Sequence, residues 1–189
     1  DQARGIRIKE DDLSPLIKDM LKASTSKLRS LKKISQLPHD HPAKKFVDDR
    51  KIPADKHYLI YFAPKFYKFV NTIIDNKFPS LSGDHPRLVI PFYNEKNELI
   101  AIQGRAFGNE NPKYITIKTE ESQDKIYGLE RINWKHQVYV VEGPIDSLFV
   151  DNCLATAQSD LRIYKDNVVL IPDNEPRNVE VVKQIEKYI

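Results

Sequence analysis

The sequence predicts an α/β protein in two parts: a small mixed α+β subdomain with an antiparallel sheet, followed by a subdomain with a parallel sheet. Residues 87–103 contain two apolar runs on either side of the polar turn Asn94–Asn97, which is the pattern of a β-hairpin. Farther along, Val138–Val141 and Val168–Ile171 are unbroken apolar runs ended by Gly-Pro and by Pro, as is typical of strands buried on both faces. The hairpin indicates the first sheet, and the two buried runs indicate the second.

Composition places the chain among globular proteins and excludes several classes. Of its 189 residues, 40% are hydrophobic and 30% are charged. No apolar run approaches the ~20 residues that span a bilayer, and the chain does not open on a signal-peptide pattern. The single cysteine, Cys153, excludes an internal disulfide and a cysteine-based zinc site. We therefore expect a cytoplasmic protein without a membrane partner. Because the chain begins with Asp and stops within an apolar helical pattern, we also expect a fragment of a longer protein.

The first 37 residues are predicted to form a basic helical arm. Ser14-Pro15 is a favourable helix start, with Ser as the N-cap and Pro in the first turn. From Met20 to Lys45 the only acidic residue is Asp40, among many Lys and Arg. The net charge of +3 does not by itself indicate a nucleic-acid partner. We interpret this stretch first as a solvated helix face, and second as a contact for a nucleic-acid backbone.

The segments that follow alternate between helix and strand. His39 and His41 have a spacing at which they could share a metal ion, but no further ligand is near in sequence, so a turn into a helix at 43–50 is favoured. Gly104, after the hairpin, allows the backbone to approach another group closely. The other expected elements are a strand or buried turn at 56–63, an aromatic amphipathic segment at 64–76, strands at 87–93, 99–103 and 113–118, and a turn at 127–129.

Acidic residues follow both buried strands of the second part. Glu142 comes directly after the first strand, and Asp173 and Glu175 follow the second. If the strands are parallel neighbours, ~5 Å apart, these carboxylates converge where open α/β sheets bind ligands, and Asp146 joins them from the next helix. Carboxylates without matching Lys or Arg repel one another, and Mg²⁺ suits them best because it leaves positions for water and substrate phosphates. The implied chemistry is metal-assisted phosphoryl transfer; the alternative is a helix-start pair and a separate polar turn.

The same residues resemble a known domain. Glu142-Gly-Pro-Ile-Asp146 followed by Asp173-Asn-Glu175 is similar to the Toprim domain of primases, topoisomerases and related nucleases, in the form found in primases of T-even-like phages. The resemblance implies that Glu142, Asp173 and Glu175 are catalytic and hold Mg²⁺, for which Mn²⁺ substitutes. It also implies that Asp146 supports the catalytic site. The chain departs from many relatives at Gln158, where they have Gly after a short central strand, and this bears on the local packing.

Motifs in the middle of the chain extend the resemblance, over residues 38–189, to the DnaG-type primase polymerase core. By this resemblance, Arg87, Arg105 and Lys113 line a basic groove for template and nucleotide, because Arg and Lys hold phosphates with little sequence information. The alternative for each is a surface charge on a strand. Tyr114 is expected to stack on a base or, equally, to pack in the core. The motifs are Arg87–Pro91, Gln103–Arg105, Lys113–Ile115 and Tyr127–Leu129, with His41–Ala43 and Ala63–Phe66 similar to the phage form.

These patterns predict the RNA-polymerase core of a phage-type DNA primase. We expect a basic arm at 1–37, the amino-terminal subdomain at 38–134 and an incomplete Toprim subdomain at 135–189. The expected reaction is Mg²⁺-dependent synthesis of short RNA primers from ribonucleoside triphosphates on single-stranded DNA, for phage replication in the cytoplasm of an infected bacterium. The resemblance also implies a replicative helicase as partner.

Two alternatives stay open. A Toprim nuclease or topoisomerase would use the same carboxylates, although a topoisomerase needs a nucleophilic Tyr on a further domain. A single-stranded DNA-binding module would result if the catalytic site is incomplete.

Overall fold

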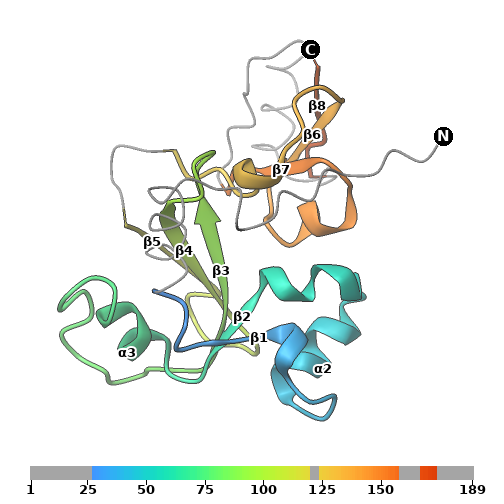
Figure 1. Cartoon of the computed structure of the whole chain (residues 1–189). Helices are drawn as coiled ribbons and strands as arrows, with labels where there is room; N and C mark the ends of the chain where they lie inside the picture. The colour runs from blue at the N-terminus through green and yellow to red at the C-terminus, as the bar shows by residue number, and fades with distance from the viewer. Residues whose placement is uncertain (1–26, 120–123, 158–166, 174–189) are drawn as a thin grey trace, which may run out of the picture.

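The computed structural model describes residues 27–119, 124–157 and 167–173 (Figure 1). The arm before residue 27, Gln158, Glu175 and the carboxyl-terminal helical pattern lie outside the described residues. The helical elements are α2 (Pro42–Asp49) and α3 (Phe66–Asn71), with the 3-10 turns η2 (Ile34–Gln36), η3 (Ala54–Leu59), η4 (Leu129–Arg131) and η5 (Asp146–Phe149). The strands are β1 (Lys32–Lys33), β2 (Tyr61–Ala63), β3 (Arg87–Tyr93), β4 (Leu99–Ala106), β5 (Tyr114–Lys118), β6 (Val138–Val141), β7 (Cys153–Ala155) and β8 (Val168–Leu170).

Strands β1 to β5 form one antiparallel sheet in sequence order, which confirms the predicted hairpin. In this sheet Leu88 pairs with Arg105, and Arg105 pairs with Tyr114 on the next strand. Asn97 closes the hairpin turn with a positive φ of 61°, a conformation that Asn tolerates better than most residues. The two apolar runs and the polar turn between them therefore predict β3 and β4 correctly.

The predicted basic helix is wrong for residues 27–37. After a turn, Lys32 and Lys33 form β1 and pair with Phe62 and Tyr61, and η2 follows. The amide of Ile34 continues this contact by donating to the carbonyl of residue 60, at 2.8 Å. The spacing of the apolar residues in 27–37 fits a helix. The backbone of Lys32 and Lys33 instead forms its hydrogen bonds with β2, which is distant in the sequence.

Both short helices have their first turns capped by side chains. His41 accepts a hydrogen bond from the amide of Ala43 (3.1 Å) as the N-cap of α2, which confirms the turn interpretation of this histidine. Helix α3 is shorter than the predicted amphipathic segment. Its first turn is capped from a distance by the buried carboxylate of Asp84, which accepts from the amides of Tyr67 (2.8 Å) and Lys68 (3.1 Å).

Strands β6, β7 and β8 form a second, parallel sheet in the order β7-β6-β8. Tyr139 of β6 pairs with Cys153 on one side and with Val169 on the other. The two apolar runs predicted to be parallel neighbours are therefore confirmed as such. Among the described strands, β6 lies in the middle, with β7 on one side and β8 on the other.

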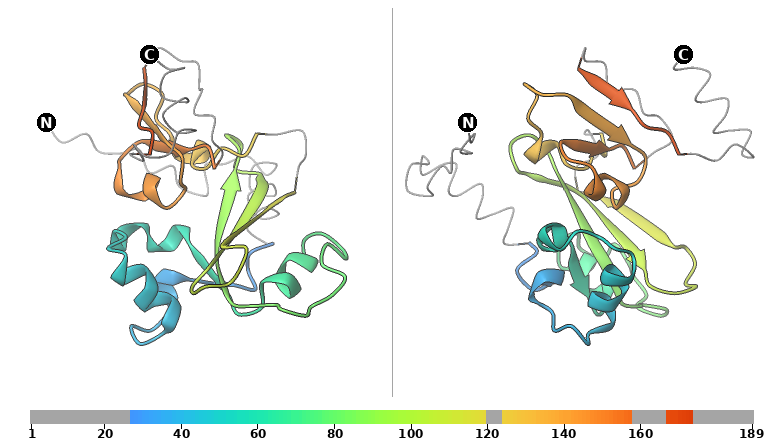
Figure 2. Two further views of the ribbon diagram at one scale, coloured as in Figure 1. Left: turned by 180° about the vertical axis from the view of Figure 1, so that it is seen from behind. Right: turned by 90° about the vertical axis from the view of Figure 1, so that its right-hand side faces the viewer.

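One hydrophobic core lies between the two sheets, and a second lies on the opposite face of the antiparallel sheet. The joining core contains Val47 of α2, Phe92 of β3 and Val141 of β6. The second core contains Phe66 of α3 and Val89 of β3, so α2 and α3 cover opposite faces of the antiparallel sheet (Figures 1 and 2). The parallel sheet lies beyond one end of β3 and β4 in all these views. Within the described ranges, no helix is long and apolar enough to cross a membrane.

The predicted close approach at Gly104 is made by an aromatic ring in the second core. A Cβ atom on Gly104 would lie 2.5 Å from Cζ of Phe66, well inside van der Waals contact. Phe66 has no solvent exposure, so its ring is held against the strand backbone. Glycine at this position therefore allows the Phe66 ring to pack directly against the backbone of β4.

Candidate active site

A pocket of about 410 Å³ lies where the end of the parallel sheet meets β4 and β5. The predicted carboxylates Glu142, Asp146 and Asp173 all line it. The opposite wall comes from the antiparallel sheet and from the end of α2. It includes Gln103, Thr116, Tyr114 and Arg50. The pocket therefore collects residues from six stretches of the sequence, at 50, 103, 114–116, 142–146, 157 and 173.

The turn after β6 brings two of the carboxylates together. Glu142 follows the strand directly, and its carbonyl accepts from the amide of Ala157 after β7 (2.9 Å). The next residue, Gly143, accepts from the amide of Ser147 (3.1 Å), which folds the chain back toward the pocket. A side chain on Gly143 would overlap the Asp146 carboxylate. Gly143 is thus needed for Asp146 to sit against the turn that carries Glu142.

Electrostatic coupling links the two strand ends across the pocket. Partial burial raises the pKa of the Asp146 carboxyl above its ordinary value, and the nearby charge of Asp173 raises this pKa further. The positive charges of Arg50 and Arg105 act on the same pKa in the opposite direction. Acidic and basic groups therefore share this site, with the carboxylates on one wall, Arg50 on the other, and Arg105 buried close by.

The pocket is compatible with a hard cation but does not by itself form a complete metal site. In the parts of the chain that the structure describes, no group of three Asp, Glu, His or Cys side chains could hold a metal ion. Glu142 and Asp173 supply oxygen donors of the kind that Mg²⁺ takes, and the third predicted ligand, Glu175, lies outside the described residues. The Mg²⁺ site stays a prediction.

Arg105 lies close to the pocket but is almost fully buried. Its guanidinium lies near the rings of Phe46 and Tyr114, with Cζ 4.5 Å and 5.6 Å from the ring centroids. Nε donates to the Tyr114 hydroxyl (3.1 Å), and Nη1 donates to the carbonyl of Ala106 (2.9 Å). Tyr114 itself is 43% exposed, so it presents a face to the pocket and not only to the core.

Arg87 and Lys113, the other predicted groove residues, have different surroundings. Arg87 is 1% exposed and donates to the carbonyls of Gly104 (3.3 Å), Lys113 (3.2 Å) and Pro112 (3.0 Å). These contacts connect β3 and β4 to the segment before β5, which is a structural role; a contact between Arg87 and a template stays a prediction. Lys113 is exposed, with Nζ 5.8 Å from the Tyr114 ring centroid, so it is free to reach a ligand.

Sequence reasoning missed three residues of the pocket wall. Gln103 donates to the hydroxyl of Thr116 (3.2 Å), its partner on the neighbouring strand. Strand alternation was a usable signal here, since Gln103 is two residues from Arg105 and must share its face. Arg50 follows α2 and looks like an ordinary charged helix end in the sequence. Only the packing of α2 beside β4 brings it to the carboxylates.

Comparison with solved structures identifies the class of the fold as the DnaG primase catalytic core. The catalytic domain of a DnaG primase bound to single-stranded DNA matches with a TM-score of 0.62 and 17% identity, over 90% of this chain and 66% of that chain. The zinc-binding and RNA-polymerase domains of the Aquifex aeolicus primase match with a TM-score of 0.58 and 17% identity, over 94% of this chain and 53% of that chain. At these identities the likeness shows the fold, and it confirms the predicted α/β architecture. No protein-family model matches the chain.

A curated relative is far closer in sequence. The chain is 41% identical to the DNA primase of Enterobacteria phage T4 over 167 residues, which cover 86% of this chain and 48% of that protein. The resemblance to phage primases is thereby confirmed. The chain spans about half the length of this curated relative.

Proposed function

We propose that this chain carries the RNA-polymerase core of a phage-type DNA primase, which joins ribonucleotides on a single-stranded DNA template. The observation that carries the proposal is the pocket itself. It places Glu142, Asp146 and Asp173 at the end of the parallel sheet, opposite Tyr114 and Arg50. Phosphoryl transfer needs such a combination, because catalysis depends on holding the phosphates in place and offsetting their charge. The similarity to the phage T4 primase supports the same reaction.

The carboxylates and the basic residues have separate tasks in this proposal. Glu142 and Asp173 would hold Mg²⁺, together with Glu175 from outside the described residues, and Asp146 would support them. When bound, the ion would offset part of the negative charge of a nucleoside triphosphate. On the opposite wall, Arg50 is exposed and lines the pocket, so its guanidinium would bind triphosphate oxygens.

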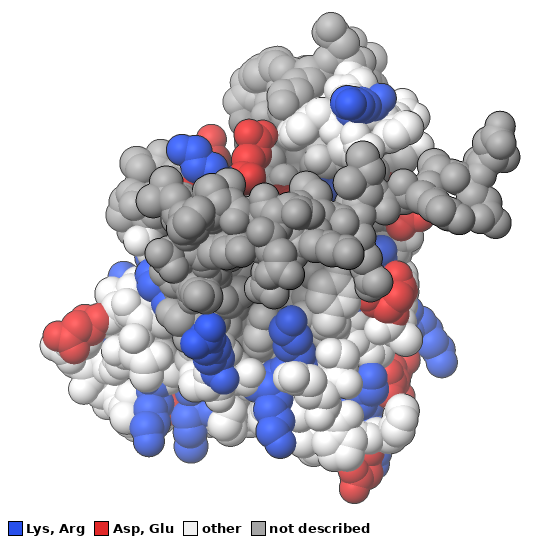
Figure 3. All heavy atoms as spheres, in the orientation of Figure 1, with Lys and Arg blue, Asp and Glu red and all other residues white. Residues whose placement is uncertain are grey.

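Template binding is proposed for the exposed basic and aromatic residues beside the pocket. Lys113 would contact a DNA phosphate, and Tyr114, held by Arg105, would stack on a base. Lys and Arg side chains also gather over the antiparallel-sheet half of the face shown in Figure 3, with acidic side chains mainly toward its edges. Such a surface suits a polyanion, since each phosphate contact releases counterions. A replicative helicase as partner and the cytoplasm of an infected bacterium as location belong to the same proposal.

Ribonucleotide incorporation on a DNA template tests this function. We expect the chain to bind single-stranded DNA and to extend a pre-annealed primer slowly with Mg²⁺, and to synthesise few primers from free nucleotides. Incorporation that is unaffected by removing divalent ions would contradict the proposal. DNA binding without any incorporation would instead favour a non-catalytic DNA-binding module.

The metal ligands are tested separately by calorimetric titration with Mn²⁺. Asp173→Asn should weaken Mn²⁺ binding at least tenfold, equivalent to about 1.4 kcal/mol. Asp151→Asn is the matched control, because its side chain is 98% exposed and it does not line the pocket. Equal Mn²⁺ affinity in both variants would remove Asp173 from the site.

A further inference from the structure

The ring of Phe46 lies near two guanidinium groups, those of Arg50 and Arg105. Phe46 is on α2, and the Cζ atom of Arg50, just beyond the end of the same helix, is 5.0 Å from its ring centroid. The Cζ atom of Arg105, on β4, is 4.5 Å from the same centroid. Both distances are within the range in which a guanidinium is attracted to the electron-rich face of an aromatic ring. A single ring therefore contacts an exposed arginine of the pocket and a buried arginine beneath it.

The orientation of the Phe46 ring is itself restrained by its neighbours. Phe107, the residue after β4, packs edge-on against it with centroids 5.3 Å apart and planes at 88°. The Tyr114 ring also lies near Arg105, and its hydroxyl accepts a hydrogen bond from Nε of the guanidinium. With Arg105 held in place by these contacts, the Phe46 ring has a defined position from which to contact Arg50.

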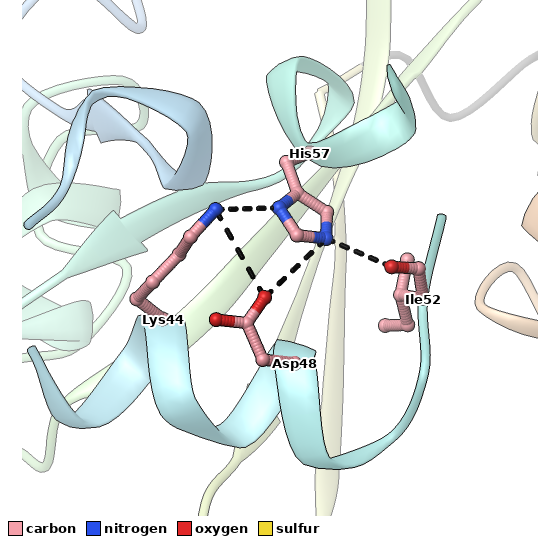
Figure 4. Close-up of polar contacts among 4 residues, drawn as sticks. All are labelled: Lys44, Asp48, Ile52 and His57. Carbon is pink, nitrogen blue, oxygen red and sulfur yellow. Dashed lines mark hydrogen bonds and ion pairs between the residues drawn. The ribbon is translucent and has the colours of Figure 1, made fainter. Parts of the chain in front are cut away.

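The helix that carries Phe46 is anchored by a polar cluster in which Lys44 and His57 are buried and Asp48 is exposed (Figure 4). Nζ of Lys44 lies 2.7 Å from Nδ1 of His57, and Nε2 of His57 lies 2.9 Å from the carbonyl of Ile52. A lysine ammonium can only donate, so Nδ1 of His57 accepts and Nε2–H donates to the carbonyl. Asp48 lies 4.0 Å from Lys44 and 3.9 Å from His57. This cluster attaches α2 to η3 and thereby sets where Phe46 lies.

We propose that Phe46 is a positioning residue, whose ring holds the Arg50 guanidinium on the pocket wall in the orientation that binds the phosphates of a nucleoside triphosphate. The inference rests on the proposed function. Arg50 is otherwise an exposed side chain on a flexible stem, and holding it against a ring removes rotamer freedom before the ligand arrives. Arg50 and Asp146 line the same pocket, so a guanidinium held there lies within the site that the carboxylates form.

Binding of ATP with Mg²⁺ to the full chain, measured by calorimetry, tests this role. Phe46→Leu should raise the Kd for ATP about fivefold to tenfold, and Phe46→Tyr, which keeps the ring, should restore affinity to within about twofold. Val47→Ala is the matched control: it removes buried volume from the same helix, and Val47 has no aromatic ring to attract either guanidinium. An equal loss of affinity in Val47→Ala, or none in Phe46→Leu, would overturn the proposal.

A double-mutant cycle separates positioning from a general structural effect. If Phe46 acts through Arg50, Phe46→Leu should cause no further loss of ATP affinity once Arg50→Ala is present. Additive losses would overturn the proposal.

An NMR measurement tests the ring contact without any nucleotide. The Arg50 Hε resonance should carry a ring-current shift that Phe46→Leu abolishes. No change in that resonance would overturn the inference. A lost shift in a chain that binds no ATP at all would instead count against the proposed function, and not against the contact.

Discussion

Gly104→Ala should destabilise the fold, because the new methyl group would collide with a buried ring. Its Cβ would lie 2.5 Å from two carbons of the Phe66 ring and 2.9 Å from a third. Carbon atoms pack at about 3.5–4.0 Å, so the ring must move by about 1 Å. Phe66 has no solvent exposure and is surrounded by core side chains, which leave no room for that movement. Overpacking of this kind costs about 1–3 kcal/mol, from which the advantage of Ala over Gly in a strand, about 0.5–1 kcal/mol, is subtracted.

The central values of these two ranges leave a net loss of about 1 kcal/mol in the free energy of unfolding, which urea unfolding measures. For a domain of this length, that loss also lowers Tm by about 2–4 °C per kcal/mol. Gly108→Ala is the matched control, because its Cβ would meet only the flexible carboxylate of Glu110. In a Phe66→Leu background, the smaller side chain leaves room for the new methyl group, so the cost of Gly104→Ala should largely disappear. Wild-type stability of Gly104→Ala, or the same cost in both backgrounds, would refute the steric argument.

Further outcomes follow from the capping, burial and charge described above. Asp84→Ala should lower the free energy of unfolding by about 1–2 kcal/mol in urea titrations, because two amides of the first turn of α3 lose their acceptor; Asp84→Asn should lose less. Burial raises the pKa of the Tyr127 hydroxyl from 10.0 to about 12. Its contribution to the free energy of unfolding is therefore complete below pH 10 and is lost as the pH rises to 12. Between pH 10 and 12, the Tm of Tyr127→Phe should therefore fall less steeply than the Tm of the unaltered chain. Lys113→Ala should weaken single-stranded DNA binding for all sequences and reduce the salt slope by about one, measured in a KCl series. Arg87→Ala should instead lower stability, since its guanidinium bonds three backbone carbonyls.

Local patterns in the sequence were sufficient for most strands and for the acidic side of the site. The hairpin of β3 and β4 follows from two apolar runs around a polar turn, and each apolar run of the second part became a parallel strand. Glu142 and Asp173 reach one pocket because a parallel sheet aligns the ends of its strands at one edge. These features can be predicted because strands and turns are recognised from residues that are close together in the sequence.

The basic side of the site was decided by the tertiary structure. Arg87 and Arg105 read as surface charges or groove residues, yet both are buried against rings and carbonyls supplied by distant segments. Lys32 and Lys33 became a strand because β2 offered backbone partners that no local pattern reveals. Arg50 joins the carboxylates only through the packing of α2 beside β4. A long charged side chain can be exposed or buried with nearly the same local sequence, and only contacts between segments far apart in the chain determine which of the two occurs.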